Sequence, residues 1–134
     1  MDKRTTEILS RFKKSWDDTE AHYDMLFQYD GWEFLRELRV FLTELRRQNF
    51  DEKLRIGTSM HRLIFSRSIE HGLRKDQKQL VIEAFDNGNY DIMFYDFTAP
   101  GELIKKYDEF STTELRGNQR LLNNLNKLAN TVAD

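Results

Sequence analysis

The sequence predicts an α+β protein with two N-terminal helices, a three- or four-stranded antiparallel sheet, and a C-terminal helix packed on the sheet. The hydrophobic period is helical near both ends but switches to two residues between Leu54 and Asp96. A polar Asn87-Gly88 step joins two apolar segments there, as in a β-hairpin. With 134 residues, 10 of them Phe, the chain can bury a core as one domain over 1–134.

An amphipathic helix is expected over the first 26 residues. Its apolar positions recur every three or four residues, while the intervening positions are mostly charged. Those apolar positions are Ile8, Leu9, Phe12, Trp16, Tyr23 and Leu26. The stretch from Asp17 to Glu20 has no apolar anchor, and Thr19 there is able to cap a fresh helix. One helix or two therefore both fit this segment.

A second helix is expected to begin at the Asp30-Gly31-Trp32-Glu33 step. Asp30 and Glu33 have the spacing of a capping box, and Gly31 disfavours continuation of the preceding helix. The apolar face of this second helix comprises Phe34, Leu35, Leu38, Phe41, Leu42 and Leu45. Two arginines near its C-terminal end interact favourably with the helix dipole. We expect the helix to end before Asn49.

The first strand is expected between Leu54 and Phe65. Apolar and polar residues alternate up to Met60, and the alternation breaks afterwards. One strand with a bulge near His61-Arg62 explains both halves. The charged segment from Ser68 to Lys78 is then a long connection, which we expect to be the most mobile internal loop.

The next two strands are expected over 80–85 and 90–95, with Asn87 and Gly88 as a two-residue type I′ turn. That turn fixes the register, so that Phe85 faces Tyr90 and Glu83 faces Ile92. Both faces of this hairpin are then mainly apolar, which predicts that helices or another subunit cover both of them.

The segment after the only proline, Pro100, is open to two interpretations. Residues 103–110 fit a short helix as well as a fourth strand, and we expect the strand. Ser111-Thr112-Thr113-Glu114 has the pattern of a capping box, which predicts that the last helix begins there. Its apolar stripe comprises Leu115, Leu122, Leu125, Leu128, Ala129 and Val132.

The charge distribution suggests partners rather than a reaction. Formal net charge is −2, yet residues 36–75 contain 10 Lys or Arg against 5 Asp or Glu. A basic middle with acidic ends is compatible with an acidic protein partner, although the ends also compensate this charge within the fold. No aromatic RNA-binding motif accompanies the basic residues, so nucleic acid is not expected as a partner.

The sequence has no cysteine, and its three histidines lie far apart. We therefore expect no metal site and no cofactor, because zinc sites use closely spaced Cys or His. Glycine-rich phosphate loops and nucleophile elbows are also missing from the sequence. The N-terminus has no apolar signal segment and no run is long enough to span a membrane, which predicts a cytoplasmic protein without membrane contact.

Several basic residues are candidates for ligand or partner binding. Arg55, His61 and Arg67 share one face of the predicted first strand if no bulge intervenes. Such a line of groups suits a carboxylate or phosphate, with His61 titrating near neutral pH. The alternative to ligand binding is that these side chains lie at the border of the sheet and are exposed to solvent. Arg74 and Lys75, in the long loop, are the remaining basic candidates.

Glu83 is the one acid inside an otherwise apolar strand. A carboxylate there needs a cationic partner, and Arg62 and Arg67 are the natural candidates. The pair is either structural or part of a pocket. From all this we expect a non-enzymatic, self-associating protein-interaction module. The rival hypothesis is a ligand-binding or hydrolytic pocket between sheet and helices, formed by His61, Arg67 and Glu83.

Overall fold

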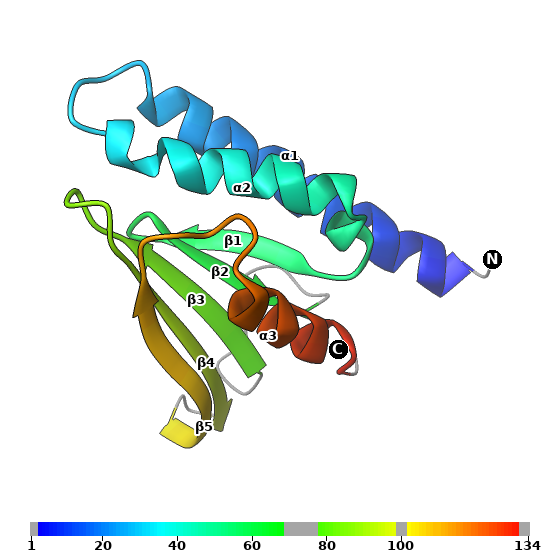
Figure 1. Cartoon of the computed structure of the whole chain (residues 1–134). Coiled ribbons are helices and arrows are strands. Elements are labelled where there is room, and N and C mark those ends of the chain that lie inside the picture. Colours follow the sequence, from blue (N-terminus) through cyan, green and yellow to red (C-terminus); the bar gives the residue numbers. More distant parts are fainter. Residues whose placement is uncertain (1–2, 69–77, 99–101, 132–134) are drawn as a thin grey trace.

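A computed structural model of the chain describes residues 3–68, 78–98 and 102–131. Helix α1 spans Lys3–Leu26, and α2 spans Arg36–Arg47 after a 3₁₀ turn at Glu33–Leu35. A second 3₁₀ turn, Phe50–Glu52, leads into the strands, and α3 spans Gln119–Ala129. Figure 1 shows α1 and α2 side by side, running in opposite directions across the sheet. These elements confirm the predicted fold class.

The sheet has five antiparallel strands in the order β1-β2-β3-β4-β5. They are β1 (Arg55–Ser59), β2 (Arg62–Ser66), β3 (Lys78–Ala84), β4 (Tyr90–Thr98) and β5 (Glu102–Thr112). The strand predicted over 103–110 is thus confirmed. The single bulged strand predicted over 54–65 is wrong, because β1 and β2 are two strands that pair as a hairpin.

The turn between β1 and β2 consists of Met60 and His61, whose φ angles are 51° and 68°. A two-residue hairpin turn of this kind needs positive φ at both positions, which normally selects Asn or Gly. Neither residue gives that signal in the sequence. The bulge interpretation therefore failed because Met60 occupies a conformation that residues other than Gly, Asn, Asp and His rarely adopt.

The turn between β3 and β4 has three residues rather than two. The Phe85 N–H donates to the Asn89 carbonyl at 2.9 Å, and the Gly88 N–H donates to the Phe85 carbonyl at 3.2 Å. Gly88 has φ +90°, as in a type I turn followed by a left-handed glycine bulge. The predicted register is therefore wrong by one residue: Glu83 faces Asp91, and Ala84 faces Tyr90.

This register changes which residues share a face of the hairpin. The face that carries Leu80 and Ile82 of β3 also carries Ile92 and Phe94 of β4, and all four are buried. On the other face, Glu83 lies opposite Asp91. The predicted grouping of residues on the two faces is therefore wrong, because a one-residue slip exchanges the faces of a whole strand.

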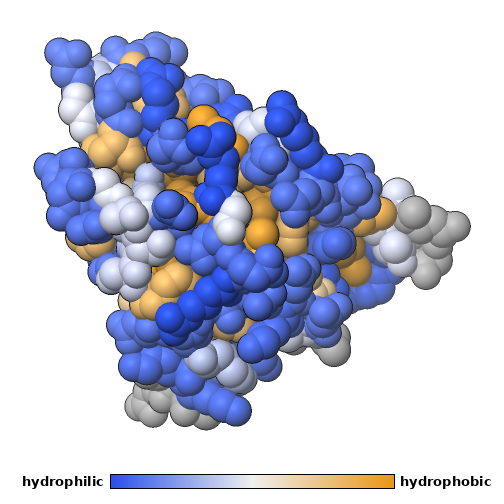
Figure 2. All heavy atoms as spheres, in the orientation of Figure 1, coloured by the Kyte–Doolittle hydropathy of each residue, from blue (hydrophilic) through white to orange (hydrophobic). Residues whose placement is uncertain are grey.

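The core lies between the apolar face of the sheet and the helices. It combines helix residues such as Trp16, Tyr23 and Leu42 with strand residues such as Phe65. The Trp16 and Phe65 rings meet edge to face, with centroids 6.3 Å apart. Figure 2 shows apolar residues in the middle of one face of the molecule, within a largely hydrophilic surface. Burial of these large side chains is the main stabilising contribution.

The first helix is a single one, and helix boundaries differ from the predictions at two other points. Thr19 is buried in the middle of one continuous α1 and caps nothing. No side-chain cap precedes the 3₁₀ turn before α2, and Glu33 pairs with Arg36 instead. The helix predicted from Ser111 begins only at Gln119, because β5 continues to Thr112. Asn118 caps this helix, and its side chain accepts from the Leu121 N–H.

Candidate functional site

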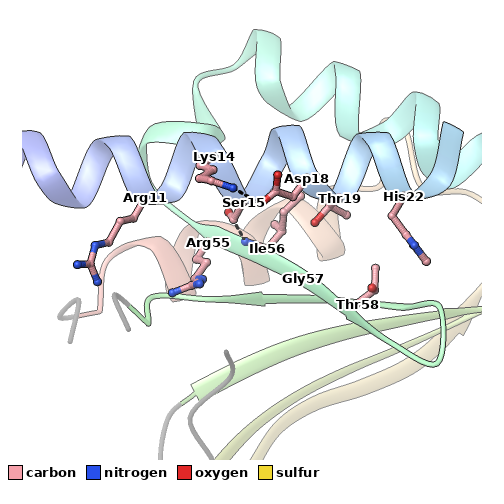
Figure 3. Close-up of a pocket in the computed structure, with 10 residues that line it drawn as sticks. All are labelled: Arg11, Lys14, Ser15, Asp18, Thr19, His22, Arg55, Ile56, Gly57 and Thr58. Carbon is pink, nitrogen blue, oxygen red and sulfur yellow. Dashed lines mark hydrogen bonds and ion pairs between the residues drawn. The ribbon is translucent and has the colours of Figure 1, made fainter. Parts of the chain in front are cut away.

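A hollow lies between α1 and β1, which is an edge strand of the sheet. Its volume is about 580 Å³, within the range of ligand-binding clefts. We call it the α1–β1 groove. The lining residues are Arg11, Lys14, Ser15, Asp18, Thr19 and His22 of α1 and Arg55, Ile56, Gly57 and Thr58 of β1. Figure 3 shows how they face one another across the groove.

The helix side of the groove follows from the period of an α-helix. Arg11, Ser15, Thr19 and His22 are three or four residues apart, so they form one stripe along α1. Two of these residues, Ser15 and Thr19, are buried although they are polar. The stripe therefore presents hydroxyl groups and basic side chains to β1 where a core-facing stripe would present apolar ones.

Hydrogen bonds hold α1 against the beginning of β1. The Ser15 hydroxyl donates to the Phe12 carbonyl at 2.6 Å and accepts from the Ile56 N–H at 3.1 Å. The Trp16 indole N–H donates to the Leu54 carbonyl at 2.8 Å. These bonds satisfy part of the free edge of the sheet, so α1 protects that edge from pairing with another strand.

Basic groups outnumber acidic ones along the groove. Arg11 pairs with Glu7 at 3.0 Å, and Lys14 pairs with Asp18 at 2.8 Å. Arg55 adds a third cationic side chain from the strand side. Figure 3 shows Arg11 and Arg55 at one end of the groove. Among the described lining residues, Asp18 is the only acidic one, so the lining is basic overall and suits anionic ligands.

A pair of histidines closes the opposite end of the groove. His22 Nε2 lies 3.1 Å from His61 Nδ1, and the two rings are stacked. The Tyr23 hydroxyl donates to the His61 carbonyl at 3.2 Å, and the Trp32 ring meets the His61 ring edge to face. Burial lowers the pKa of His22, and the neighbouring His61 lowers it further.

Glu83 pairs with Arg62, one of the two arginines predicted for it, at 3.1 Å. The Arg62 side chain is 46% exposed and the Glu83 side chain 31%, so water reaches both members of the pair. His61, Arg62 and Glu83 together line a pocket of about 90 Å³ beside Trp32. This volume is well below that of typical ligand sites.

Arg67 lies away from that pocket, just past the opposite end of β2. It donates to the carbonyls of Lys53 and Thr131, and its guanidinium lies over the Phe12 ring. These contacts tie α1, the start of β1 and the residues after α3 together. His61, Arg67 and Glu83 therefore do not converge, and the predicted line of Arg55, His61 and Arg67 on one strand does not form.

The other sequence-based candidates divide between the groove and undescribed parts of the chain. Arg55 lines the α1–β1 groove. Arg74 and Lys75 lie outside the described residues, as does most of the loop expected to be mobile. Sequence reasoning missed Ser15, Thr19 and Thr58. The available signal was the presence of hydroxyl residues at positions 15 and 19, on the apolar stripe of an amphipathic helix.

Comparisons with known proteins leave this geometry as the sole basis for a function. The chain matches no protein-family model, no curated protein and no solved structure. Within residues 3–68, 78–98 and 102–131, no three or more His, Cys, Asp or Glu residues are grouped as metal ligands would be. No helix in these ranges is long and apolar enough to cross a membrane.

Proposed function

We propose that the protein is a non-enzymatic interaction module that binds an acidic segment of a partner protein in the α1–β1 groove. The observation that carries this proposal is the lining of the groove. Of the lining residues that the structure describes, Arg11, Lys14 and Arg55 are basic and Asp18 alone is acidic, around a hollow of about 580 Å³. Charge complementarity of this kind selects partners and accelerates their association.

The hydroxyl and imidazole groups along the groove give little support to catalysis. A nucleophilic serine needs a base that takes its proton. The Ser15 hydroxyl instead donates to the Phe12 carbonyl, and the nearest partner of His22 is His61. The pocket predicted from His61, Arg67 and Glu83 has even less support than catalysis in the groove, because Arg67 lies away from the other two residues. Binding without chemistry is therefore the better proposal.

The test is binding of a fluorescein-labelled peptide of alternating glutamate and valine, measured by fluorescence anisotropy. We expect affinity that falls as salt is added, since screening weakens exposed charge pairs. The double variant Lys14→Glu, Arg55→Glu is expected to lose about tenfold or more in affinity. A control peptide with glutamine in place of glutamate is expected to bind weakly.

The matched control reverses Arg47 and Lys105 to glutamate instead. Both residues are exposed and lie outside the groove lining. This control changes the net charge of the protein by the same amount as the groove variant. Equal loss of affinity in the two variants would contradict the proposal, because it would indicate attraction by overall charge rather than by the groove.

We also propose that the protein self-associates through one end of the molecule. The support is a set of exposed apolar side chains: Met25 (43%), Tyr29 (62%), Met60 (87%) and Phe85 (38%). They belong to the end of α1 with its following loop and to the β1–β2 and β3–β4 turns. Figure 1 shows these three segments at the same end of the molecule, far from the N-terminus. Clustered apolar exposure of this kind is typical of interaction surfaces.

A further inference from the structure

We infer that the α1–β1 groove contains a site for one oxyanion of the bound peptide, with the Thr19 hydroxyl and the Thr58 backbone N–H as hydrogen-bond donors. The oxyanion is a carboxylate or a phosphoryl group. This inference rests on the proposed function and specifies which atoms of the groove recognise the acidic segment.

Thr19 is the first reason for placing the site here. Thr19 is only 5% exposed. Among the described residues, no group forms a hydrogen bond with its hydroxyl. Figure 3 shows this hydroxyl between α1 and β1. Buried polar groups almost always have a partner, because leaving one unpaired is costly. The unpaired hydroxyl lines the groove, so it is free to donate to a group bound there.

Ser15, one helical turn earlier on this stripe, has a hydroxyl whose hydrogen bonds are satisfied within the protein. It donates to the Phe12 carbonyl and accepts from the Ile56 N–H. Ser15 thus fills the space between helix and strand by itself. Thr19 occupies the equivalent position in the next turn without making either bond.

Thr58 is the second donor, because its backbone points out of the sheet. Residues of an antiparallel edge strand alternate between facing the neighbouring strand and facing outward. The Ile56 N–H faces outward, since it donates to Ser15. Thr58, two residues later, therefore also directs its N–H away from β2 and toward the groove.

The register between α1 and β1 brings the two donors to the same level. The two elements run in the same direction, because Ser15 contacts Ile56 and Tyr23 contacts His61 further along both. Four helical residues advance about 6 Å, and two strand residues advance about 6.6 Å. Thr19 and Thr58 therefore lie at the same level along the two elements, and both line the groove.

The surroundings favour a negative group at this point. Lys14, Arg11 and Arg55 supply positive charge from both walls, and Asp18 is already paired with Lys14. Gly57, beside Thr58, adds no side chain, and a Cβ built on it meets nothing within 4 Å. The groove is thus open next to the two donors, and hydrogen bonds to a charged acceptor are strong ones.

The experiment is an NMR titration of the ¹⁵N-labelled protein with three acetylated, amidated pentapeptides of sequence Val-Ser-X-Ser-Val. X is glutamate, phosphoserine or glutamine. We expect the glutamate or the phosphoserine peptide to bind at least about fivefold more tightly than the glutamine peptide. The Thr58 amide proton is expected to shift downfield on binding, as an N–H does when it donates to an anion. The tighter of the two anionic peptides identifies the source of the oxyanion.

Thr19→Val is the decisive variant, and Thr19→Ser is its matched control. Valine keeps the shape and removes the unpaired hydroxyl, so we expect a melting temperature higher by about 2 to 6 °C with about tenfold weaker binding of the anionic peptide. Serine keeps the hydroxyl and is expected to retain most of the affinity. A hydroxyl with a purely structural role would instead lower the melting temperature when removed.

Three outcomes would overturn the inference: equal affinity for all three peptides, an unmoved Thr58 amide at saturation, or undiminished affinity in Thr19→Val. If Lys14→Glu, Arg55→Glu abolishes binding while Thr19→Val leaves it unchanged, the proposed function stands and this inference fails. If none of the anionic peptides binds, both are wrong.

Discussion

The Arg62–Glu83 pair shows how exposure decides the value of an ion pair. If the pair were buried, removing one partner would leave an uncompensated charge and cost several kcal/mol. With side chains 46% and 31% exposed, water solvates whichever partner remains. We expect Glu83→Gln and Arg62→Gln each to lower the free energy of unfolding by about 1 kcal/mol or less.

A double-mutant cycle by urea denaturation measures this coupling directly. The coupling between Arg62 and Glu83 is expected to be below about 1 kcal/mol and to decrease with added salt. A coupling of about 3 kcal/mol would mean that the pair is shielded from water, and it would restore the case for a functional carboxylate at Glu83.

His22 gives stability a dependence on pH near neutrality. Its pKa in the folded protein is lower than the ordinary value of 6.5, so the unfolded chain binds more protons around that pH. The free energy of unfolding therefore falls as the pH falls below about 6.5. We expect urea denaturation of His22→Gln to show a weaker decrease between about pH 7.5 and pH 5.5. An identical pH dependence in the two proteins would contradict this origin.

The β1–β2 hairpin contains a local conflict between sequence and conformation. Met60 has φ 51° and is 87% exposed, so its side chain gains little packing to offset the strained backbone. Left-handed backbone costs about 1 to 2 kcal/mol for most residues, and asparagine tolerates it better. We expect Met60→Asn to raise the free energy of unfolding by about 1 kcal/mol, measured by urea denaturation.

The control for this prediction is Met60→Ala, which removes the same side chain but not the strain. It is expected to leave the free energy of unfolding nearly unchanged, since the lost contacts are few. If the two variants are equally stable, the turn is not strained in solution.

The two hairpins also show what sequence patterns determine. Asn87-Gly88 identified the β3–β4 hairpin correctly, because glycine marks the left-handed position. The pattern left the loop length open by one residue, and that residue exchanged the faces of the predicted strands. Met60-His61 gave no turn signal at all. Likewise, the capping-box pattern at Ser111 was wrong because β5 pairing continues to Thr112, and tertiary pairing outweighs a local preference.

The candidate site was less predictable than the fold, because it depends on contacts between distant segments. Arg55 was identified from its charge, and the pairing of Glu83 with an arginine from its isolation in an apolar strand. Thr58 carries no such signal, since hydroxyl residues are common on strands. The signal at Thr19 was only its place on the apolar stripe of a helix. Only the alignment of α1 with β1 brings the two threonines together, and this alignment depends on the hydrogen bond between Ser15 and Ile56.

At the scale of the whole molecule, the grounds for self-association change. The sequence suggested a sheet with two apolar faces, to be covered by helices or by another subunit. In the structure the helices cover one face, and Ile64 and Val81 on the other are only 6% and 8% exposed. The sheet therefore needs no second copy to cover it. Unburied apolar surface remains instead at the end formed by the β1–β2 and β3–β4 turns.

Sedimentation velocity over a roughly hundredfold range of concentration tests association through that end. A small interface of a few apolar side chains supports only a weak complex, so we expect a reversible dimer that appears at the upper concentrations. Met60→Asp with Tyr29→Ser is expected to keep the protein monomeric, because a charge at the centre of an apolar contact is costly to desolvate. Val40→Ser, which alters an exposed apolar residue on α2, is the control and should leave the dimer intact. A wild-type protein that remains monomeric throughout would show that this end has another role.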